Sequence, residues 1–149
     1  MTDETGDGWL DNYLPYLMYR VSIRLNARLP YRLRALDLNL PEWRILSVLR
    51  SYGGLSAAGI AAHSLMEQPV VNRVIAQLVQ DGMVSKARAS LNNGEIEIRL
   101  TPKADETFNE IFPAAQRHQA LALNGFEAKE IQAFRATMDK IERNIAFER

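Results

Sequence analysis

Residues 67–100 read EQPVVNRVIAQLVQDGMVSKARASLNNGEIEIRL, and their apolar periodicity changes at Gly82. Before this glycine, apolar residues recur every three or four positions, which predicts a helix with one buried face. That face consists of Val71, Ile75, Leu78 and Val79. After the glycine, apolar and charged residues alternate over 95–100, which predicts a half-buried strand. The segment 83–89 is its predicted partner, because the Asn93-Gly94 dipeptide between them is typical of a type I′ hairpin turn.

Two helices are predicted immediately upstream. Asn39 stands three residues before Glu42, which is the spacing of a capping box, so a helix is expected over 40–51. The Gly53-Gly54 dipeptide ends it. Ser56 is a suitable N-cap for a short further helix that carries Ala57, Ile60, Ala61 and Ala62.

The N-terminal region has the pattern of a long helix running from Trp9 to Leu29. Its apolar residues lie three or four positions apart, at Leu10, Leu14, Leu17, Val21, Leu25 and Leu29. Pro15 suits a helix start, whereas Pro30 marks a kink or an end. The helix is therefore expected to break near Leu29.

Further helices are predicted after the hairpin. Thr101 and Pro102 form a helix start that is followed by Phe108, Ile111 and Phe112, and Pro113, Asn124 and Gly125 are expected to interrupt the C-terminal third. The last helix carries a narrow apolar seam of Ile131, Phe134, Met138, Ile141 and Ile145. The rest of a single chain of this size cannot cover this seam by itself, so a homodimer is predicted.

The composition narrows the possible functions. The chain has 149 residues with 18 basic and 18 acidic side chains and is 47% hydrophobic, which predicts one globular domain, or one domain with helical extensions. The absence of cysteine excludes disulfides, thiolate metal sites and cysteine-based peroxide sensing. With two histidines, no metal site or other cofactor is expected. No apolar run approaches the roughly 18 residues of a membrane span, so a cytoplasmic protein without membrane contact is expected.

Helix, short helix, turn, helix and hairpin in this order describe a winged helix-turn-helix. The motifs LPEWRIL (40–46), EQPVVNRVIAQLVQDGMV (67–84) and IRLTPKA (98–104), in this order and spacing, resemble the MarR family of bacterial transcription regulators. The resemblance implies a mainly α fold with a small β-hairpin, flanked by N- and C-terminal dimerisation helices. The implied division is an N-terminal dimerisation region at 1–38, a winged DNA-binding lobe at 39–103 and C-terminal dimerisation helices at 104–149.

The wing departs from the family pattern. Family members usually carry an Asp-x-Arg or Asp-Arg-Arg element there, whereas this chain aligns Asn92, Asn93 and Gly94 with it. Between Leu40 and Leu100 the chain has six basic and five acidic residues, a surplus of one charge. Counterion release on DNA binding is therefore expected to be small.

The helix that ends at Gly82 is the second helix of the helix-turn-helix, and it is expected to enter the major groove of double-stranded DNA. Its exposed side carries Gln68, Asn72 and Arg73, whose amide and guanidinium groups can pair with base edges. Gln77, Lys86 and Arg88 are further candidate DNA contacts. The alternative for all six is an ordinary solvated surface. Ser56 is interpreted mainly as a helix cap. It could also contact a DNA phosphate, because the N-terminus of a helix favours anions.

The first helix is rich in aromatic and basic residues, and Trp43 follows in the next one. Aromatic walls beside arginine suit a small aromatic acid, whose ring is desolvated while its carboxylate is paired. The resemblance also implies an effector cleft between the dimerisation helices and the winged lobe. The predicted effector residues are Tyr13, Tyr16, Arg20, Arg24 and Trp43. The alternative is a dimer core with solvated arginines; His63 is given no chemical role.

The sequence thus predicts a homodimeric repressor that binds a palindromic operator and is released by a small aromatic or phenolic acid. The rival hypothesis, favoured by the neutral wing, is a winged-helix dimer that has lost DNA affinity and acts as a protein-interaction module. An enzyme is not expected, because the chain has no Gly-rich phosphate loop, His-Glu metal pair or Gly-x-Ser-x-Gly elbow.

Overall fold

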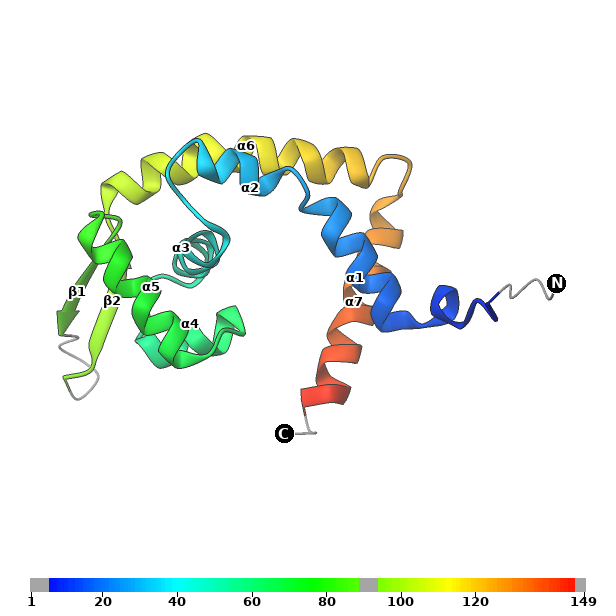
Figure 1. Ribbon diagram of the computed structural model, residues 1–149, viewed down its shortest axis with the longest axis horizontal. Coiled ribbons are helices and arrows are strands. Elements are labelled where there is room, and N and C mark those ends of the chain that lie inside the picture. The colour runs from blue at the N-terminus through cyan, green and yellow to red at the C-terminus, as the bar shows by residue number, and fades with distance from the viewer. Residues whose placement is uncertain (1–5, 89–93, 147–149) are drawn as a thin grey trace. The chain divides into compact units, whose positions relative to one another are not determined.

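The computed structural model describes residues 6–88 and 94–146 (Figure 1). In chain order the elements are the 3₁₀ helix η1 (Trp9–Asn12), helices α1 (Leu14–Leu25), α2 (Leu29–Arg34), α3 (Leu40–Tyr52), α4 (Ala57–Ser64) and α5 (Gln68–Gln80), strands β1 (Val84–Arg88) and β2 (Ile96–Leu100), and helices α6 (Pro102–Ala122) and α7 (Ala128–Ile145). The predicted fold class, mainly α with a small hairpin, is confirmed. The chain forms two compact units, residues 1–116 and 117–149.

The core of the first unit lies between α3, α4, α5 and the hairpin. Its fully buried side chains come from all of these elements and include Ile45, Leu46, Ile60, Val71, Ile75, Leu78 and Ile98. Burying each such side chain stabilises the fold by about 1.5–3 kcal/mol. Val79 was predicted on the buried face of α5 but is exposed, and Val74 is buried instead. The buried stripe consists of positions 71, 74, 75 and 78. Val79 is one residue further along the helix and therefore points away from this stripe.

Local signals at the ends of α3 and α4 agree with the sequence. The amide of Glu42 donates to Asn39 Oδ1 at 2.9 Å, and the amide of Asn39 donates to Glu42 Oε2 at 3.2 Å, which completes the predicted capping box. Gly53 follows α3 with a φ of 78°, a left-handed conformation that favours glycine. Ser56 caps α4 by accepting the amide of Gly59 at 3.1 Å.

Helix α5, the helix expected to enter the major groove and called the recognition helix below, ends in a Schellman motif. The amide of Gly82 donates to the carbonyl of Val79 at 3.1 Å, and the amide of Met83 donates to that of Leu78 at 2.8 Å. Both bonds satisfy carbonyls that the helix end leaves without intrahelical partners. Gly82 has a φ of 71°, as its place after the last helical turn requires. Strand β1 begins two residues later, so the direction of α5 is closely tied to that of the wing.

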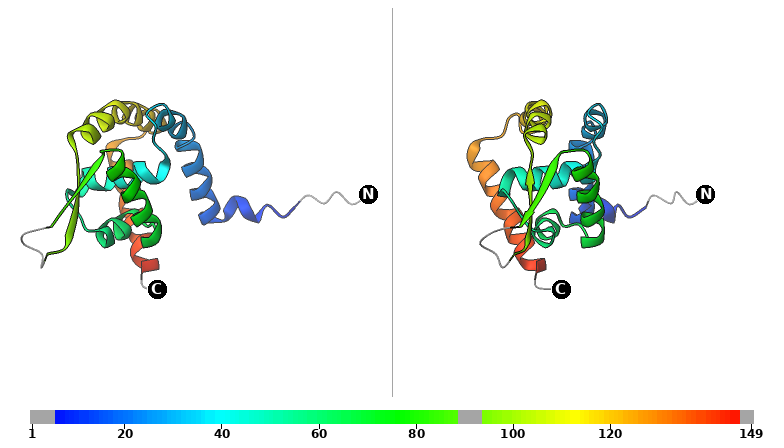
Figure 2. Two further views of the ribbon diagram at one scale, coloured as in Figure 1. Left: turned by 60° about the vertical axis from the view of Figure 1, so that its left-hand side comes forward. Right: turned by 90° about the vertical axis from the view of Figure 1, so that its left-hand side faces the viewer.

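The wing is an antiparallel hairpin in which Val84 pairs with Leu100 and Arg88 with Ile96. Figure 2 shows the two strands running side by side, with β2 leading directly into α6. Leu55, between α3 and α4, extends the hairpin with two backbone hydrogen bonds to Ile98, of 2.8 and 3.1 Å. The predicted hairpin is therefore confirmed, although Asn93 of its turn lies outside the described residues.

The predicted break near Leu29 is confirmed, since residues 26–28 separate α1 from α2. The prediction that the long helix begins at Trp9 is wrong, because residues 9–12 form the separate 3₁₀ helix η1. Pro30 does not end a helix, because it lies in the first turn of α2. The N–H groups of a first turn have no acceptor within the helix, so the N–H that proline lacks costs no hydrogen bond. Pro15 lies in the first turn of α1, as predicted.

The predicted break at Pro113 is also wrong, since α6 continues from Pro102 to Ala122. A proline inside a helix removes one hydrogen bond, which a helix of 21 residues can tolerate. The predicted break at Asn124 and Gly125 is confirmed, and Gly125 has a φ of 86°. Among the described residues, no helix has both the length and the apolar character needed to cross a membrane.

Candidate nucleic-acid interface and ligand cavity

The buried residues of α5 fix which side of this helix faces outward. Because Val71, Val74, Ile75 and Leu78 pack into the core, the opposite side is left open. Gln68, Asn72, Arg73 and Gln77 are all exposed. By helical spacing Arg73 lies opposite the buried stripe, Asn72 and Gln77 lie on its two flanks, and Gln68 lies in the first turn. The six predicted DNA contacts thus include four exposed residues of one helix.

Two of the predicted contacts come together between α5 and the wing. Asn72 and Lys86 line the same small cavity of about 220 Å³, whose other walls are Ala57, Ile75, Ile96 and Ile98. An amide from the recognition helix and an ammonium group from β1 therefore lie on one continuous surface. Such a surface can place one group at a base edge and the other at the adjacent phosphate backbone.

The remaining two predicted contacts have different surroundings. Gln77 donates through Nε2 to Asp81 Oδ1 at 3.1 Å, so its amide is partly engaged within the helix. Arg88 ends β1 and reaches across the hairpin, where its Nη1 lies 3.6 Å from the place that a Cβ on Gly94 would take. The guanidinium group thus lies at the base of the wing turn.

Ion pairs leave the basic residues of this surface available. Arg50 pairs with Asp105 at 3.2 Å, and Arg99 pairs with Glu97 at 2.9 Å. Within residues 6–88 and 94–146, the ion pairs do not include Arg73, Lys86 or Arg88. Residues 67–100 nevertheless carry four basic and four acidic side chains, so these three basic groups act locally and give the surface no net positive charge.

A larger cavity of about 630 Å³ lies between α1, α2, α3 and α4, all within the first unit. This volume is within the range of small-molecule sites. Its walls are Ser22, Ile23, Asn26, Ala27, Leu29, Pro30, Leu40, Trp43, Arg44, Ser47, Val48, His63 and Ser64. The lining is mostly apolar, with two basic side chains, Arg44 and His63, and a few hydroxyl and amide groups.

The five predicted effector residues do not all line this cavity. Trp43 does, whereas Tyr13, Tyr16, Arg20 and Arg24 are not among its walls. The guanidinium group of Arg20 instead lies 5.8 Å from the ring centre of Tyr16 and 4.0 Å from a carboxylate oxygen of Asp11. The ring of Tyr13 packs against that of Trp9, with centroids 5.2 Å apart.

Arg44 and His63 were not predicted as cavity residues from the sequence. A usable signal was present for Arg44, because Leu40, Trp43, Arg44, Ser47 and Val48 follow one helical face at the spacing of three and four. His63 gave no such signal. Its ring stacks on that of Tyr52, with centroids 4.0 Å apart and an interplanar angle of 21°, which positions it at the cavity.

Helix α4, the turn after it and α5, followed by the hairpin, define the class of protein as a winged helix-turn-helix. Residues 36–91 match the MarR family. The predicted resemblance to the MarR family is thereby confirmed, with the winged lobe as the part that matches the family model.

Similar proteins support this assignment over most of the chain. A MarR-family transcriptional regulator of Silicibacter pomeroyi is 29% identical, with a TM-score of 0.83 and coverage of 97% of this chain and 96% of the other. The HTH-type transcriptional repressor Rv2887 of Mycobacterium tuberculosis is 26% identical over 88% of this chain and 94% of its own. BpsR of Bordetella bronchiseptica, whose DNA binding is regulated by 6-hydroxynicotinic acid, shares the fold at 19% identity, a TM-score of 0.71 and coverage of 87% and 98%.

Proposed function

We propose that this chain is a homodimeric DNA-binding transcription regulator, a repressor that a small aromatic or phenolic acid releases from its operator. The observation that carries the proposal is the exposed surface of α5, where Gln68, Asn72 and Arg73 are accessible and Asn72 lines one cavity with Lys86 of the wing. The Silicibacter and Mycobacterium relatives are described as transcription regulators, which supports this function rather than an enzymatic one.

In the proposed complex, α5 lies in the major groove and Asn72 and Arg73 contact base edges. Lys86 and Arg88 lie at the phosphate backbone next to the wing, and Gln68 and Gln77 lie at the two ends of the contact. This arrangement uses the basic side chains that no ion pair engages within the described part of the chain.

Dimerisation is assigned to residues 1–38 and 104–149. Helix α7 buries none of its residues, and Phe134 and Ile145 of the predicted seam are 62% and 59% exposed. Large apolar side chains in a row along a helix favour a protein partner, and a second copy supplies a matching row. A two-fold dimer in turn predicts a palindromic operator, with half-sites about 34–36 Å apart.

The effector part of the proposal rests on the cavity beside Trp43. An indole wall can stack on an aromatic ring, and Arg44 offers a guanidinium group for a carboxylate. The ligand named for BpsR, 6-hydroxynicotinic acid, is a small aromatic acid of this kind, which supports the same chemical class here. The first-helix residues Tyr13, Tyr16, Arg20 and Arg24 stay the sequence-based candidates for the same role.

A second candidate function is a winged-helix dimer that binds proteins and not DNA. The observation that favours it is the uncharged Asn92-Asn93-Gly94 sequence where the family usually has an arginine. The two asparagines lie outside the described residues, so only the sequence bears on them.

A gel-shift titration separates the two functions. The full-length protein is incubated with DNA from upstream of its own coding region, and with a shuffled sequence of equal length, over a series of salt concentrations. The repressor proposal expects a specific shift that weakens steeply as salt rises, because phosphate contacts release counterions. Failure to shift either DNA at low salt, with a folded protein, favours the protein-interaction module.

A further inference from the structure

A single hydroxyl group joins the end of the recognition helix to the start of α6. Thr101 donates through Oγ1 to the carbonyl of Gly82 at 2.6 Å, and the same oxygen accepts the amide of Ala104 at 3.4 Å. The backbone amide of Thr101 also donates to the carbonyl of Met83 at 3.1 Å. Thr101 is thus at once the N-cap of α6 and a donor to the turn that ends α5.

Lys103 adds a second tie between the same two helix ends. Its Nζ donates to the carbonyl of Asp81 at 2.8 Å. The last carbonyls of a helix lack intrahelical donors and carry partial negative charge, so an ammonium group placed there is favourable. Residues 81–83 therefore accept three hydrogen bonds from Thr101 and Lys103.

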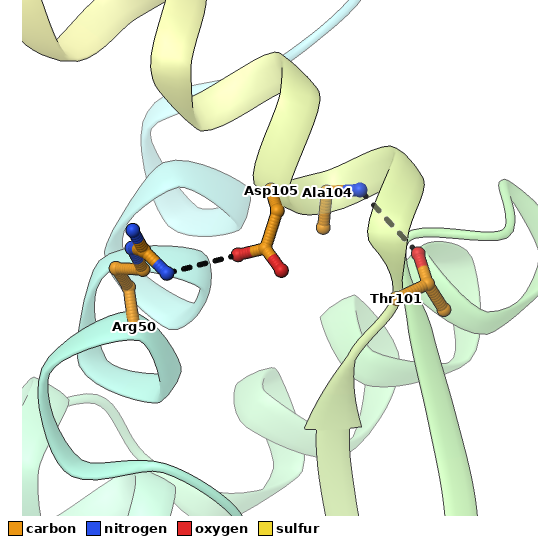
Figure 3. Close-up of polar contacts among 4 residues, drawn as sticks. All are labelled: Arg50, Thr101, Ala104 and Asp105. Carbon is orange, nitrogen blue, oxygen red and sulfur yellow. Dashed lines mark hydrogen bonds and ion pairs between the residues drawn. The ribbon is translucent and has the colours of Figure 1, made fainter.

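The other side of this helical turn is fixed to α3. Asp105 accepts a hydrogen bond from Nη1 of Arg50 at 3.2 Å, and Figure 3 shows this pair beside the contact between Thr101 and Ala104. The guanidinium carbon of Arg50 also lies 5.6 Å from the ring centre of Phe108, one turn further along α6. Ala104 between these contacts is buried, so α6 packs closely at this point.

These contacts hold the C-terminal end of α5. The helix has 13 residues, about 20 Å at 1.5 Å per residue, and it is held at its C-terminal end. Gln68 and Asn72 lie towards the opposite end. A small rotation at residues 81–83 is therefore enlarged at the residues assigned to DNA.

We propose that the first turn of α6 passes displacements of α6 to the recognition helix, with Thr101 and Lys103 as positioning residues. Its consequence for DNA recognition rests on the proposed function. Neither residue is assigned to a DNA contact; each acts on the carbonyl groups that end α5. Asp105 belongs to the same turn but contacts α3 and not α5. If weakening its contact with α3 alters the end of α5, the turn moves as a unit.

The test combines amide hydrogen exchange with operator binding, in full-length protein. Thr101→Val removes the hydroxyl group at nearly equal size, and Thr101→Ser retains it. Lys103→Met removes the ammonium group, and Asp105→Asn weakens the link to α3. Glu106→Gln, an exposed neighbour on the same turn, is the control for Asp105→Asn.

Exchange at the amides of residues 80–83 is expected to accelerate about fivefold in Thr101→Val and Lys103→Met, as for one lost hydrogen bond. Thr101→Ser should restore the wild-type rate, and Asp105→Asn should accelerate the same amides while Glu106→Gln does not. Operator affinity should fall by a similar factor in the first two variants with an unchanged salt slope. A lost phosphate contact would instead lower that slope by about 1.

Two results would overturn the proposal where the wild type binds DNA, and a third applies where it does not. One is unchanged exchange at residues 80–83 in both Thr101→Val and Lys103→Met. The other is faster exchange with operator binding unaltered in a protein whose wild type binds DNA. If the wild type binds no DNA, the proposed function fails separately, and Asp105→Asn still decides the issue: faster exchange at residues 80–83 supports transmission through the turn, and an unchanged rate excludes it.

Discussion

The indole ring of Trp43 stacks on the phenyl ring of Phe108, with centroids 5.1 Å apart and an interplanar angle of 15°. Trp43 also lines the larger cavity, and Phe108 lies one turn beyond Asp105 on α6. A molecule in the cavity would therefore be separated from α6 by one side chain. Phe112, on the same helix, extends the stack, with its ring centre 5.1 Å from that of Phe108. This contact links the proposed effector cavity to the helix whose first turn holds α5.

Replacing Arg73 by alanine tests the DNA surface directly. If the guanidinium group pairs with a base edge, Arg73→Ala should weaken operator binding by about 1–3 kcal/mol, roughly fivefold to 150-fold. Binding to shuffled DNA should change much less. Gln80→Ala, at the last residue of α5, is the control and should leave both affinities unaltered. Equal losses on operator and shuffled DNA would make Arg73 a phosphate contact, and no loss on either would remove it from the interface.

The capping box offers a test of local stability. Asn39→Ala removes the acceptor of the Glu42 amide, and the free energy of unfolding should fall by about 1 kcal/mol. Urea titration followed by circular dichroism measures the loss. Asn39→Ser retains a capping oxygen and should lose only part of it. If the serine variant loses as much as the alanine variant, the hydrogen bond is not the cause.

Most of the winged lobe could be predicted because its boundaries depend on local chemistry. Asn39 and Glu42 cap each other across three residues, and Gly82 is needed for a left-handed turn. Both signals act within one helical turn, so a sequence displays them. Proline was less informative, since its effect depends on its position: Pro30 begins a helix and Pro113 lies inside one. That difference is decided by packing elsewhere in the chain.

The same distinction between local and tertiary signals applies to the two candidate sites. The exposure of Asn72 and Arg73 follows from the period of one helix, and the sequence predicted it. The cavity is formed by residues from α1, α2, α3 and α4, which only the tertiary fold brings together. Arg44 and His63 were therefore not predicted as effector residues, although Trp43, which lines the same cavity, was.

Substitution of Ile141 tests the assignment of α7 to a dimer. Ile141→Asp places a charge in the predicted seam and should convert a dimer into monomers or unfold the chain. Ala136→Asp introduces the same charge on another side of α7, at an exposed residue, and should leave the assembly intact. Sedimentation velocity with circular dichroism distinguishes these outcomes. A wild-type chain that sediments as a monomer at micromolar concentration would contradict the dimer outright.

The last prediction concerns which arginine holds an effector carboxylate. In a Trp9→Phe background Trp43 is the remaining tryptophan, so its fluorescence reports on the cavity as benzoates, cinnamates and their thioesters are titrated. The cavity geometry favours Arg44, and Arg44→Gln should weaken binding about tenfold to a hundredfold, the worth of a hydrogen bond to a charged group. Arg24→Gln is the matched variant on α1, and it should have little effect because Arg24 does not line the cavity. The opposite result would assign the carboxylate to the first helix, as the sequence suggested. If none of these acids changes either Trp43 fluorescence or DNA binding in a folded protein, Trp43 is a packing residue of α3 and α6 and the effector proposal is wrong.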